Sequence, residues 1–321
     1  MPVAFRVDAR AKKNAAMLVL RLKRKSVLSA VESMADSPSS SISFVVAGGE
    51  YSDRCAPLLK RLAAALQGDD ELILLVRRDH PQTATFRPEA LRVIELAGAS
   101  IYRMRAHLPK ICRREWVVLL EDHTMVEPSA IDAIRGLIRE RPDIDLIPFL
   151  GKNLTSTGRW GWANFLFTFG PVWAPLDHPP PFSIVTSAVI RRSRLGAGEP
   201  LKDGQWELAI IPGIYRSGKF ASSNLIFVDH IKPLRFLAAL TLARSGAAIQ
   251  LDLGHGRRRV IREGWLTFWK HPRRLIRTSR TRWKELPAGT RARLNALGFV
   301  FLVGNVTATL FGGGRAVFHI D

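Results

Sequence analysis

The chain has 321 residues, enough to bury a sizeable core as one large domain or as one domain with appendages. Its 47% hydrophobic and 24% charged residues exclude a disordered protein, and its net charge of +20 indicates an anionic partner: nucleic acid, anionic lipid or a phosphorylated ligand. Only two cysteines occur, Cys55 and Cys112, which excludes a disulfide framework and a cysteine metal cluster and favours a reducing compartment.

The first forty residues predict an appendage. Residues 1–36 have the pattern of a basic, partly amphipathic helical arm, and the Ser/Pro cluster at 37–41 is typical of a linker. The apolar run at 15–20 is too short for the core of a secretory signal, and basic residues follow it directly. We therefore expect an arm and linker at 1–40, and a cytoplasmic protein.

Between residues 41 and 150, apolar runs of strand length alternate with helical patterns. The runs lie at 42–47, 72–76, 91–96, 116–120 and 144–150. Helices are predicted around 58–66, at 103–114 and from Pro128 onwards, where proline suits the first turn. This alternation predicts an α/β fold with a mostly parallel sheet flanked by helices. Ligands of such sheets bind at the carboxyl ends of the strands.

The second half of the chain is less regular. Residues 151–181 are crowded with tryptophan and phenylalanine, which is most simply core or interface packing and alternatively a wall for an acceptor. A strand is predicted at 183–190, a helix near 206–216, and a strand at 224–228 that ends in Asp229-His230. Beyond residue 231 the pattern is helical and then strongly basic.

Three side chains that can bind a metal follow the fourth strand run: Glu121, Asp122 and His123. Alternate side chains of an extended chain point the same way, so Glu121 and His123 can lie on one side. Carboxylate oxygens suit Mg²⁺ or Mn²⁺, and an imidazole favours Mn²⁺. Such an ion can bridge a diphosphate and stabilise the charge of a departing nucleotide. The alternative is a surface turn, where acids and histidines are common.

Several short motifs resemble, in their order and spacing, a family 2 glycosyltransferase of the subset whose metal motif reads Glu-Asp-His in place of Asp-x-Asp. The likeness covers roughly residues 41–250. Its motifs lie at 43–47, 102–105, 116–123, 162–165, 169–175, 187–192, 206–207, 218–219 and 228–230. The resemblance implies a GT-A fold, a nucleoside diphosphate sugar as donor substrate, and a divalent cation, Mn²⁺ or Mg²⁺, as cofactor.

The resemblance also implies roles around the cation. Glu121 and His123 take the Asp-x-Asp positions and are expected to bind the metal, with Asp122 between them at the cofactor. His230 falls where many GT-A enzymes have a late histidine near the metal and diphosphate. Arg105 matches an arginine of the family, and its guanidinium suits a phosphate.

Further site residues follow from the same resemblance. Glu207 falls where the family has an acidic residue near the acceptor, the general base of an inverting transfer, and Asp203 is the nearby substitute. Gly48, Gly49 and Glu50 after the first strand, and Asp79 after the second, are expected to contact the nucleotide. As alternatives, Glu207 is an exposed glutamate on a helix, and His230 is a structural residue.

The end of the chain has the composition of a membrane-docking region. Basic residues alternate with tryptophan and aliphatic residues at 257–284, and an apolar stretch follows at 296–311. Interfacial helices on anionic lipid have this composition, and each cation contributes on the order of 1 kcal/mol there. We predict a membrane-associating region at 251–321, in which 296–311 is too short to cross a bilayer comfortably. Single-stranded nucleic acid is the less favoured rival partner.

The resemblance, together with the basic end of the chain, implies a metal-dependent, inverting glycosyltransferase of cell envelope polysaccharide biosynthesis, peripheral at the inner face of the plasma membrane. Its acceptor is expected to be a lipid-linked or cell-surface glycan. One alternative is a catalytically inactive relative that binds a glycan or a partner protein. It is favoured by Gly48-Gly49-Glu50 in place of a Pro-Thr-Tyr-Asn type turn, and by Arg77-Arg78-Asp79 in place of paired acids that hold uridine. The other alternative is a nucleic-acid-binding protein, in which the Glu-Asp-His trio would have no role.

Overall fold

The computed structural model describes most of the chain from residue 41 to residue 311, with gaps. The described residues are 41–48, 55–77, 87–96, 104–154, 159–176, 187–196, 206–230, 256–278 and 286–311, with the single positions 243, 247, 251 and 284. They all belong to one unit that spans Ser40–Asp321. The arm and linker predicted at 1–40 lie outside the described residues.

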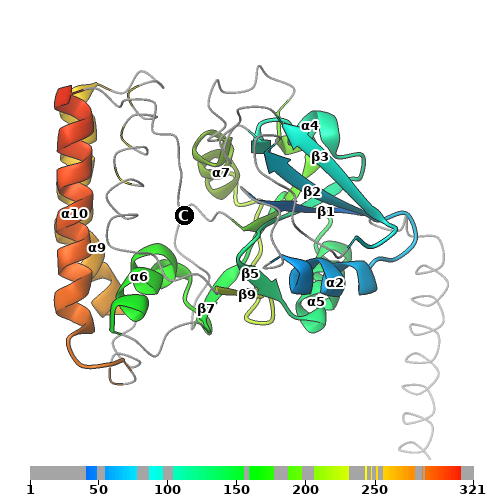
Figure 1. Ribbon diagram of the computed structural model, residues 1–321, viewed down its shortest axis with the longest axis horizontal. Helices are drawn as coiled ribbons and strands as arrows, with labels where there is room; N and C mark the ends of the chain where they lie inside the picture. The colour runs from blue at the N-terminus through cyan, green and yellow to red at the C-terminus, as the bar shows by residue number, and fades with distance from the viewer. Residues whose placement is uncertain are drawn as a thin grey trace, which may run out of the picture. The chain divides into compact units, whose positions relative to one another are not determined.

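Four parallel strands form the first part of a six-stranded sheet, in the order β3-β2-β1-β4, and Figure 1 labels the first three of them. They are β1 (Ile42–Ala47), β2 (Glu71–Arg77), β3 (Leu91–Leu96) and β4 (Trp116–Glu121). All four strand runs predicted in this part of the sequence are confirmed. Every residue of β1 is buried, which is typical of a parallel strand covered on both faces.

Two antiparallel pairings complete this sheet. β8 (Ala188–Arg191) runs antiparallel to β4, and β6 (Leu146–Pro148) runs antiparallel to β8. The prediction of one strand at 144–150 is wrong, because β6 ends at Pro148 and β7 (Leu150–Asn153) belongs to another sheet. Phe149 lies at the crossing point: its N–H donates to the Ser187 carbonyl, and the next N–H donates to Ile226. An apolar run alone does not show where a chain changes sheets.

A second sheet has three strands in the order β5-β9-β7. β9 (Phe227–His230) lies in the middle, antiparallel to β5 (Thr124–Val126) and parallel to β7. The strand predicted at 224–228 therefore begins three residues later and includes Asp229 and His230. This small sheet matters for function because β5 follows β4 after a turn of two residues, Asp122 and His123.

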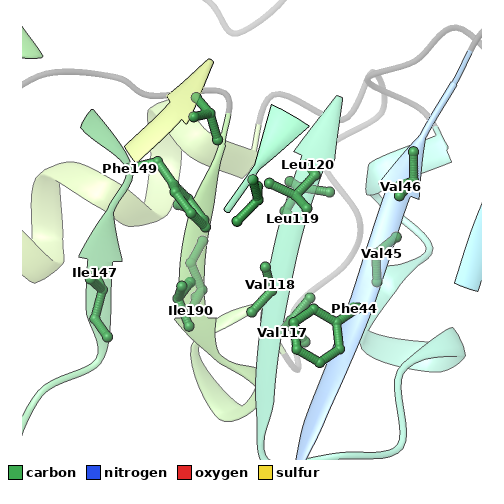
Figure 2. Packing of buried hydrophobic residues seen from close by; sticks show 14 of the residues in the cluster. Phe44, Val45, Val46, Val117, Val118, Leu119, Leu120, Ile147, Phe149 and Ile190 are labelled. Carbon is green, nitrogen blue, oxygen red and sulfur yellow. The ribbon is translucent and has the colours of Figure 1, made fainter. Parts of the chain in front are cut away.

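Buried aliphatic and aromatic side chains fill the core between the main sheet and its helices. Figure 2 shows part of this core, with Phe44 and Val45 of β1 near Val118 of β4, and with Ile190 of β8. α2 (Ala56–Ala64) and α5 (Pro128–Glu140) each bury an apolar face against this core, and α5 begins with proline as predicted. Both cysteines are buried, and burial with the nearby Glu71 charge raises the pKa of the Cys112 thiol to about 12.

The helix predicted at 103–114 is correct only in part. Met104 and Arg105 are helical, and a separate short helix, α4 (Leu108–Ile111), follows. Pro109 has no backbone N–H and therefore suits the first turn of a new helix better than the interior of a long one.

The aromatic segment forms a packed cluster around α6 (Arg159–Phe169). Phe165 stacks on Phe169 with ring centroids 5.6 Å apart, and Trp162 meets Trp173 edge-on at 5.6 Å. Phe165, Phe169 and Trp173 are buried. For these residues, core packing is the better description than an acceptor wall.

Two long helices near the end of the chain pack along each other (Figure 1). α9 (Arg257–Thr278) and α10 (Thr290–Phe311) approach closely where Gly264 faces Asn305, and α10 also packs on α6 through Phe301 and Phe167, 4.8 Å apart. α10 begins six residues before the predicted apolar stretch. In the part of the chain that the structure describes, it is the one helix long and apolar enough to cross a membrane, and half of its most apolar stretch is buried. The core helix of a soluble protein has the same length and composition.

One glycine of β7 leaves no room for a side chain. A Cβ added at Gly151 would lie 2.8 Å from the Cβ of Phe169. We expect Gly151→Ala to lower the free energy of unfolding by about 2 kcal/mol, because β7 would be pushed away from α6. Gly136→Ala on α5 is the control: nothing lies within 4 Å of its added Cβ, and alanine favours a helix by about 1 kcal/mol. Urea denaturation measures both. A stabilised Gly151→Ala variant would contradict this packing.

Candidate functional site

The predicted metal trio lies at the carboxyl end of the parallel strands. Glu121 is the last residue of β4 and the register partner of Ala47, the last residue of β1. Gly48 follows there, and its N–H donates to the Leu75 carbonyl at 3.1 Å. Asp122 and His123 form the turn that leads into β5. The Thr124 hydroxyl stabilises the turn by donating a hydrogen bond to the Glu121 carbonyl at 2.8 Å.

The three side chains of the turn contact one another. His123 lies between two carboxylates, with Nδ1 2.8 Å from Asp122 Oδ1 and Nε2 3.1 Å from Glu121 Oε2. Burial, the largest single effect, lowers the pKa of the imidazole. The charges of Glu121 and Asp122 and the hydrogen bonds to both together outweigh burial and raise this pKa to about 9. The imidazole is therefore a cation at neutral pH, bound between two anions.

Arg105 lies behind the turn. Its Nη2 is 3.2 Å from Glu121 Oε1, and its side chain is only 1% exposed. Buried there, Arg105 is placed to orient the Glu121 carboxylate. A phosphate would reach its guanidinium only if the local packing changed.

The small sheet brings a distant segment to the turn. His230 is the register partner of Thr124 across the β5–β9 pair, and Asn153 is the partner of His230 across the β9–β7 pair. The backbone of His230 therefore lies one strand away from the residue that follows His123. The side chain of His230 is outside the described part of the structure. Sequence reasoning did not single out Thr124, which directly follows the Glu121-Asp122-His123 trio, or Asn153, a polar residue at the end of a strand.

The other predicted site residues are not placed by the structure. Gly49, Glu50, Asp79 and Asp203 lie outside the described residues. Glu207 lies in the first turn of α7 (Trp206–Arg216), but its side chain is outside the described part. The described residues thus bring together Glu121, Asp122 and His123, with Gly48 nearby and Arg105 behind them.

The donor atoms of the turn suit a divalent cation in their chemistry. Metal-binding histidines usually donate their second ring N–H to a carboxylate, as Nδ1 does to Asp122 here. This leaves Nε2 facing Glu121 Oε2. Among the side chains that the structure describes, no three of His, Cys, Asp or Glu form a ready metal site. The ion pair between His123 and Glu121 has to open before a metal can bind both.

Comparisons with known proteins bear on the fold. No family model matches the chain, and no curated protein matches its sequence. Among solved structures it is similar to the mannosyltransferase PcManGT from Pyrobaculum calidifontis in complex with GDP-Man and Mn²⁺. The TM-score is 0.50 and the identity 11%, over 84% of this chain and 88% of that one.

Two other solved structures are also similar. TarS 1–349 from S. aureus has a TM-score of 0.45 and 13% identity, over 83% of this chain and 90% of that one. Glucosyl-3-phosphoglycerate synthase from Mycobacterium tuberculosis, in complex with Mn²⁺, UDP and phosphoglyceric acid, has a TM-score of 0.44 and 14% identity, over 68% and 79%. The fold comparison rests on the mannosyltransferase. With the mostly parallel sheet and its flanking helices, it confirms the predicted GT-A-type α/β fold.

Proposed function

We propose that the chain is a metal-dependent glycosyltransferase of family 2 that transfers a sugar from a nucleoside diphosphate sugar. The observation that carries the proposal is the Glu121-Asp122-His123 turn, which ends a central parallel strand of a GT-A-type fold. Ligands of such sheets bind at this edge. The register of β9, which brings His230 beside the turn, adds a further candidate ligand from a distant segment.

In this proposal, Glu121, His123 and His230 hold a divalent cation, Mn²⁺ or Mg²⁺. Asp122 holds Nδ1 of His123, so that Nε2 is the nitrogen available to the metal. When bound, the cation neutralises charge on the diphosphate of the donor. Arg105 acts on this site through Glu121, by holding one oxygen of its carboxylate.

The nucleotide is proposed to lie along the ends of β1 and β2. Gly48 and Gly49 have no side chain to keep a ligand from the backbone, and Glu50 and Asp79 are polar residues that follow these strands in the sequence. The compounds in complex with the similar structures, GDP-Man with the mannosyltransferase and UDP-GlcNAc with TarS, belong to this class of compound.

Glu207, or else Asp203, is proposed as the general base that takes the proton of the acceptor hydroxyl in an inverting transfer. We expect Glu207→Gln to abolish transfer and to leave donor affinity within about twofold, because general bases typically contribute 10²- to 10⁴-fold to rate and not to donor binding. Turnover assays and calorimetry measure the two effects. Glu140→Gln, an exposed residue of α5, is the control. Normal turnover of Glu207→Gln would remove Glu207 from this role.

A thermal-shift screen of nucleoside diphosphate sugars with and without Mn²⁺ tests the proposed function. A donor at 100 times its Kd stabilises the folded state by about 2.7 kcal/mol. For a chain of this size, that corresponds to a rise in Tm on the order of 5 °C. We expect the rise only when the cation is present. If no donor raises the Tm, or if a donor raises it equally with and without the cation, the result would instead fit the alternative of an inactive relative.

We further propose that residues 41–250 carry the transfer and that residues 251–321 dock the protein on the inner face of the plasma membrane. Arg258, Arg262, Trp265 and Trp269 follow one another at spacings of three or four along α9, so they share one side of the helix. All four are exposed, Trp265 by 51% and Trp269 by 42%. Phe299 of α10 is 55% exposed, and its ring lies 6.1 Å from Phe268, beside Trp269.

Exposed tryptophan beside exposed arginine suits the interface of an anionic lipid layer, where the rings enter the headgroups and the cations face the lipid charge. A docked enzyme of this kind meets acceptors that are themselves held at the membrane. This supports a lipid-linked or nascent cell-surface glycan as acceptor, in the synthesis of a cell envelope polysaccharide.

The double variant Trp265→Ala/Trp269→Ala is expected to bind anionic vesicles about tenfold less tightly than the unchanged protein. Partial burial of two indole rings corresponds to at least 1.4 kcal/mol, a factor of ten. Vesicle pelleting measures the affinity. Trp160→Ala, on α6 and 43% exposed, is the control and is expected to bind normally. Equal binding to neutral and anionic vesicles would defeat the docking proposal.

A further inference from the structure

One row of the small sheet collects polar residues from three strands. Thr124 begins β5, His230 ends β9 and Asn153 ends β7, and the three are register partners in that order. Side chains of register partners lie on the same face of a sheet. The side chains of Asn153 and Thr124 therefore lie on one face, in the row that also contains the backbone of His230, at the edge where the Glu121–His123 turn enters.

This face changes character at that row. The preceding row on the same face holds Val126, Val228 and Gly151, which are also register partners, and all three are buried. The residues of this face are therefore apolar or glycine in one row and polar in the next, so the apolar core ends at the row of Thr124 and Asn153. Thr124 bonds the carbonyl of Glu121, which ties the row directly to the turn.

The position of Asn153 in this row sets what it can contact. It lies two strand spacings from Thr124, about 10 Å. A ligand held by the turn would have to extend along the row past His230 to meet Asn153. A donor extends beyond its diphosphate as the nucleoside at one end and the sugar at the other. Because the nucleotide is proposed to lie along the ends of β1 and β2, the part that would extend along this row is the sugar. A carboxamide offers both a donor and an acceptor without charge, which matches sugar hydroxyls better than phosphate or a cation.

We propose that Asn153 hydrogen-bonds the sugar of the donor held at the Glu121–His123 turn and that it helps determine which sugar is accepted. This inference rests on the proposed function. Lys152 provides a matched comparison on the same strand. It is the register partner of Asp229, on the opposite face, and its Nζ lies 3.2 Å from the centroid of the Phe227 ring.

The test uses the full chain with Mn²⁺ and compares two probes by calorimetry, a nucleoside diphosphate and the matching nucleoside diphosphate sugar. Asn153→Ala is expected to weaken binding of the sugar nucleotide about tenfold, the effect of losing one well-placed hydrogen bond. Its affinity for the nucleoside diphosphate is expected to stay within twofold, which also shows that the variant is folded. Lys152→Ala is expected to change neither affinity.

The outcomes separate this inference from the function it rests on. If the unchanged protein binds neither probe, the proposed function fails, and the role of Asn153 fails with it. If the unchanged protein binds both and Asn153→Ala matches it, only the role of Asn153 is overturned. Equal loss of both affinities in Asn153→Ala and in the milder Asn153→Ser would also overturn it, because Asn153 would then support the turn and not the sugar.

Discussion

Replacing His123 with alanine is expected to weaken the Mn²⁺-dependent binding of a nucleoside diphosphate by about 100-fold or more. A bound cation contributes several kcal/mol of charge stabilisation, and each 1.4 kcal/mol is a factor of ten. His123 supplies Nε2 to the proposed site, and its second nitrogen is already held by Asp122 at 2.8 Å. Titration calorimetry with Mn²⁺ present and absent measures the loss.

The His123 variant is well suited to this test because it keeps the ion pair between Glu121 and Arg105. His107 offers a matched control: it is exposed and lies just before α4. We expect His107→Ala to bind like the unchanged protein. If His123→Ala kept full cation-dependent affinity, the imidazole would not be a metal ligand, and the turn would be only a stable surface turn.

The second large effect concerns stability. Arg105→Met is expected to lower the free energy of unfolding by about 3 kcal/mol, because it leaves a largely buried carboxylate without its cation on one side. The Arg105 side chain is 1% exposed and that of Glu121 is 13% exposed, so solvent screens this ion pair weakly. Denaturation in urea measures the change.

A double-mutant cycle separates the ion pair from simple packing. Glu121→Gln alone is expected to destabilise the protein, and the double variant Arg105→Met/Glu121→Gln is expected to lose less than the sum of the two. Arg141→Met removes an exposed pair with Asp143 and is expected to leave the denaturation midpoint nearly unchanged. Additive losses at Arg105 and Glu121 would show that the guanidinium does not act through the carboxylate.

The parallel half of the main sheet was predictable because β1, β2 and β4 are almost entirely buried, and such strands appear in the sequence as continuous apolar runs. The run at 42–47 matches β1 to the residue, and 91–96 matches β3, which lies at the edge of the sheet and is only partly buried. The run at 144–150 looked the same but divides between two sheets. Its division depends on hydrogen bonds to Ser187 and Ile226, far along the chain, which a local pattern does not contain.

The candidate site was predictable in its composition but not in its arrangement. Three consecutive metal-competent residues after a strand are visible in the sequence. The row that joins Thr124, His230 and Asn153 arises only from strand pairing between distant segments, and so remained hidden. Likewise, the match of Arg105 to a family arginine could not distinguish a phosphate contact from a buried partner of Glu121, because burial depends on tertiary packing.

The central claim is that the Glu121-Asp122-His123 turn binds a cation that in turn holds a diphosphate. The most direct measurement is a crystal structure of the protein soaked with Mn²⁺ and a nucleoside diphosphate sugar, with the anomalous signal of manganese recorded. We predict a manganese peak in contact with the Glu121 carboxylate and the His123 imidazole, on the side of the bound diphosphate. A bound donor whose diphosphate lies elsewhere, with His123 still paired to Glu121 and no manganese between them, would contradict it.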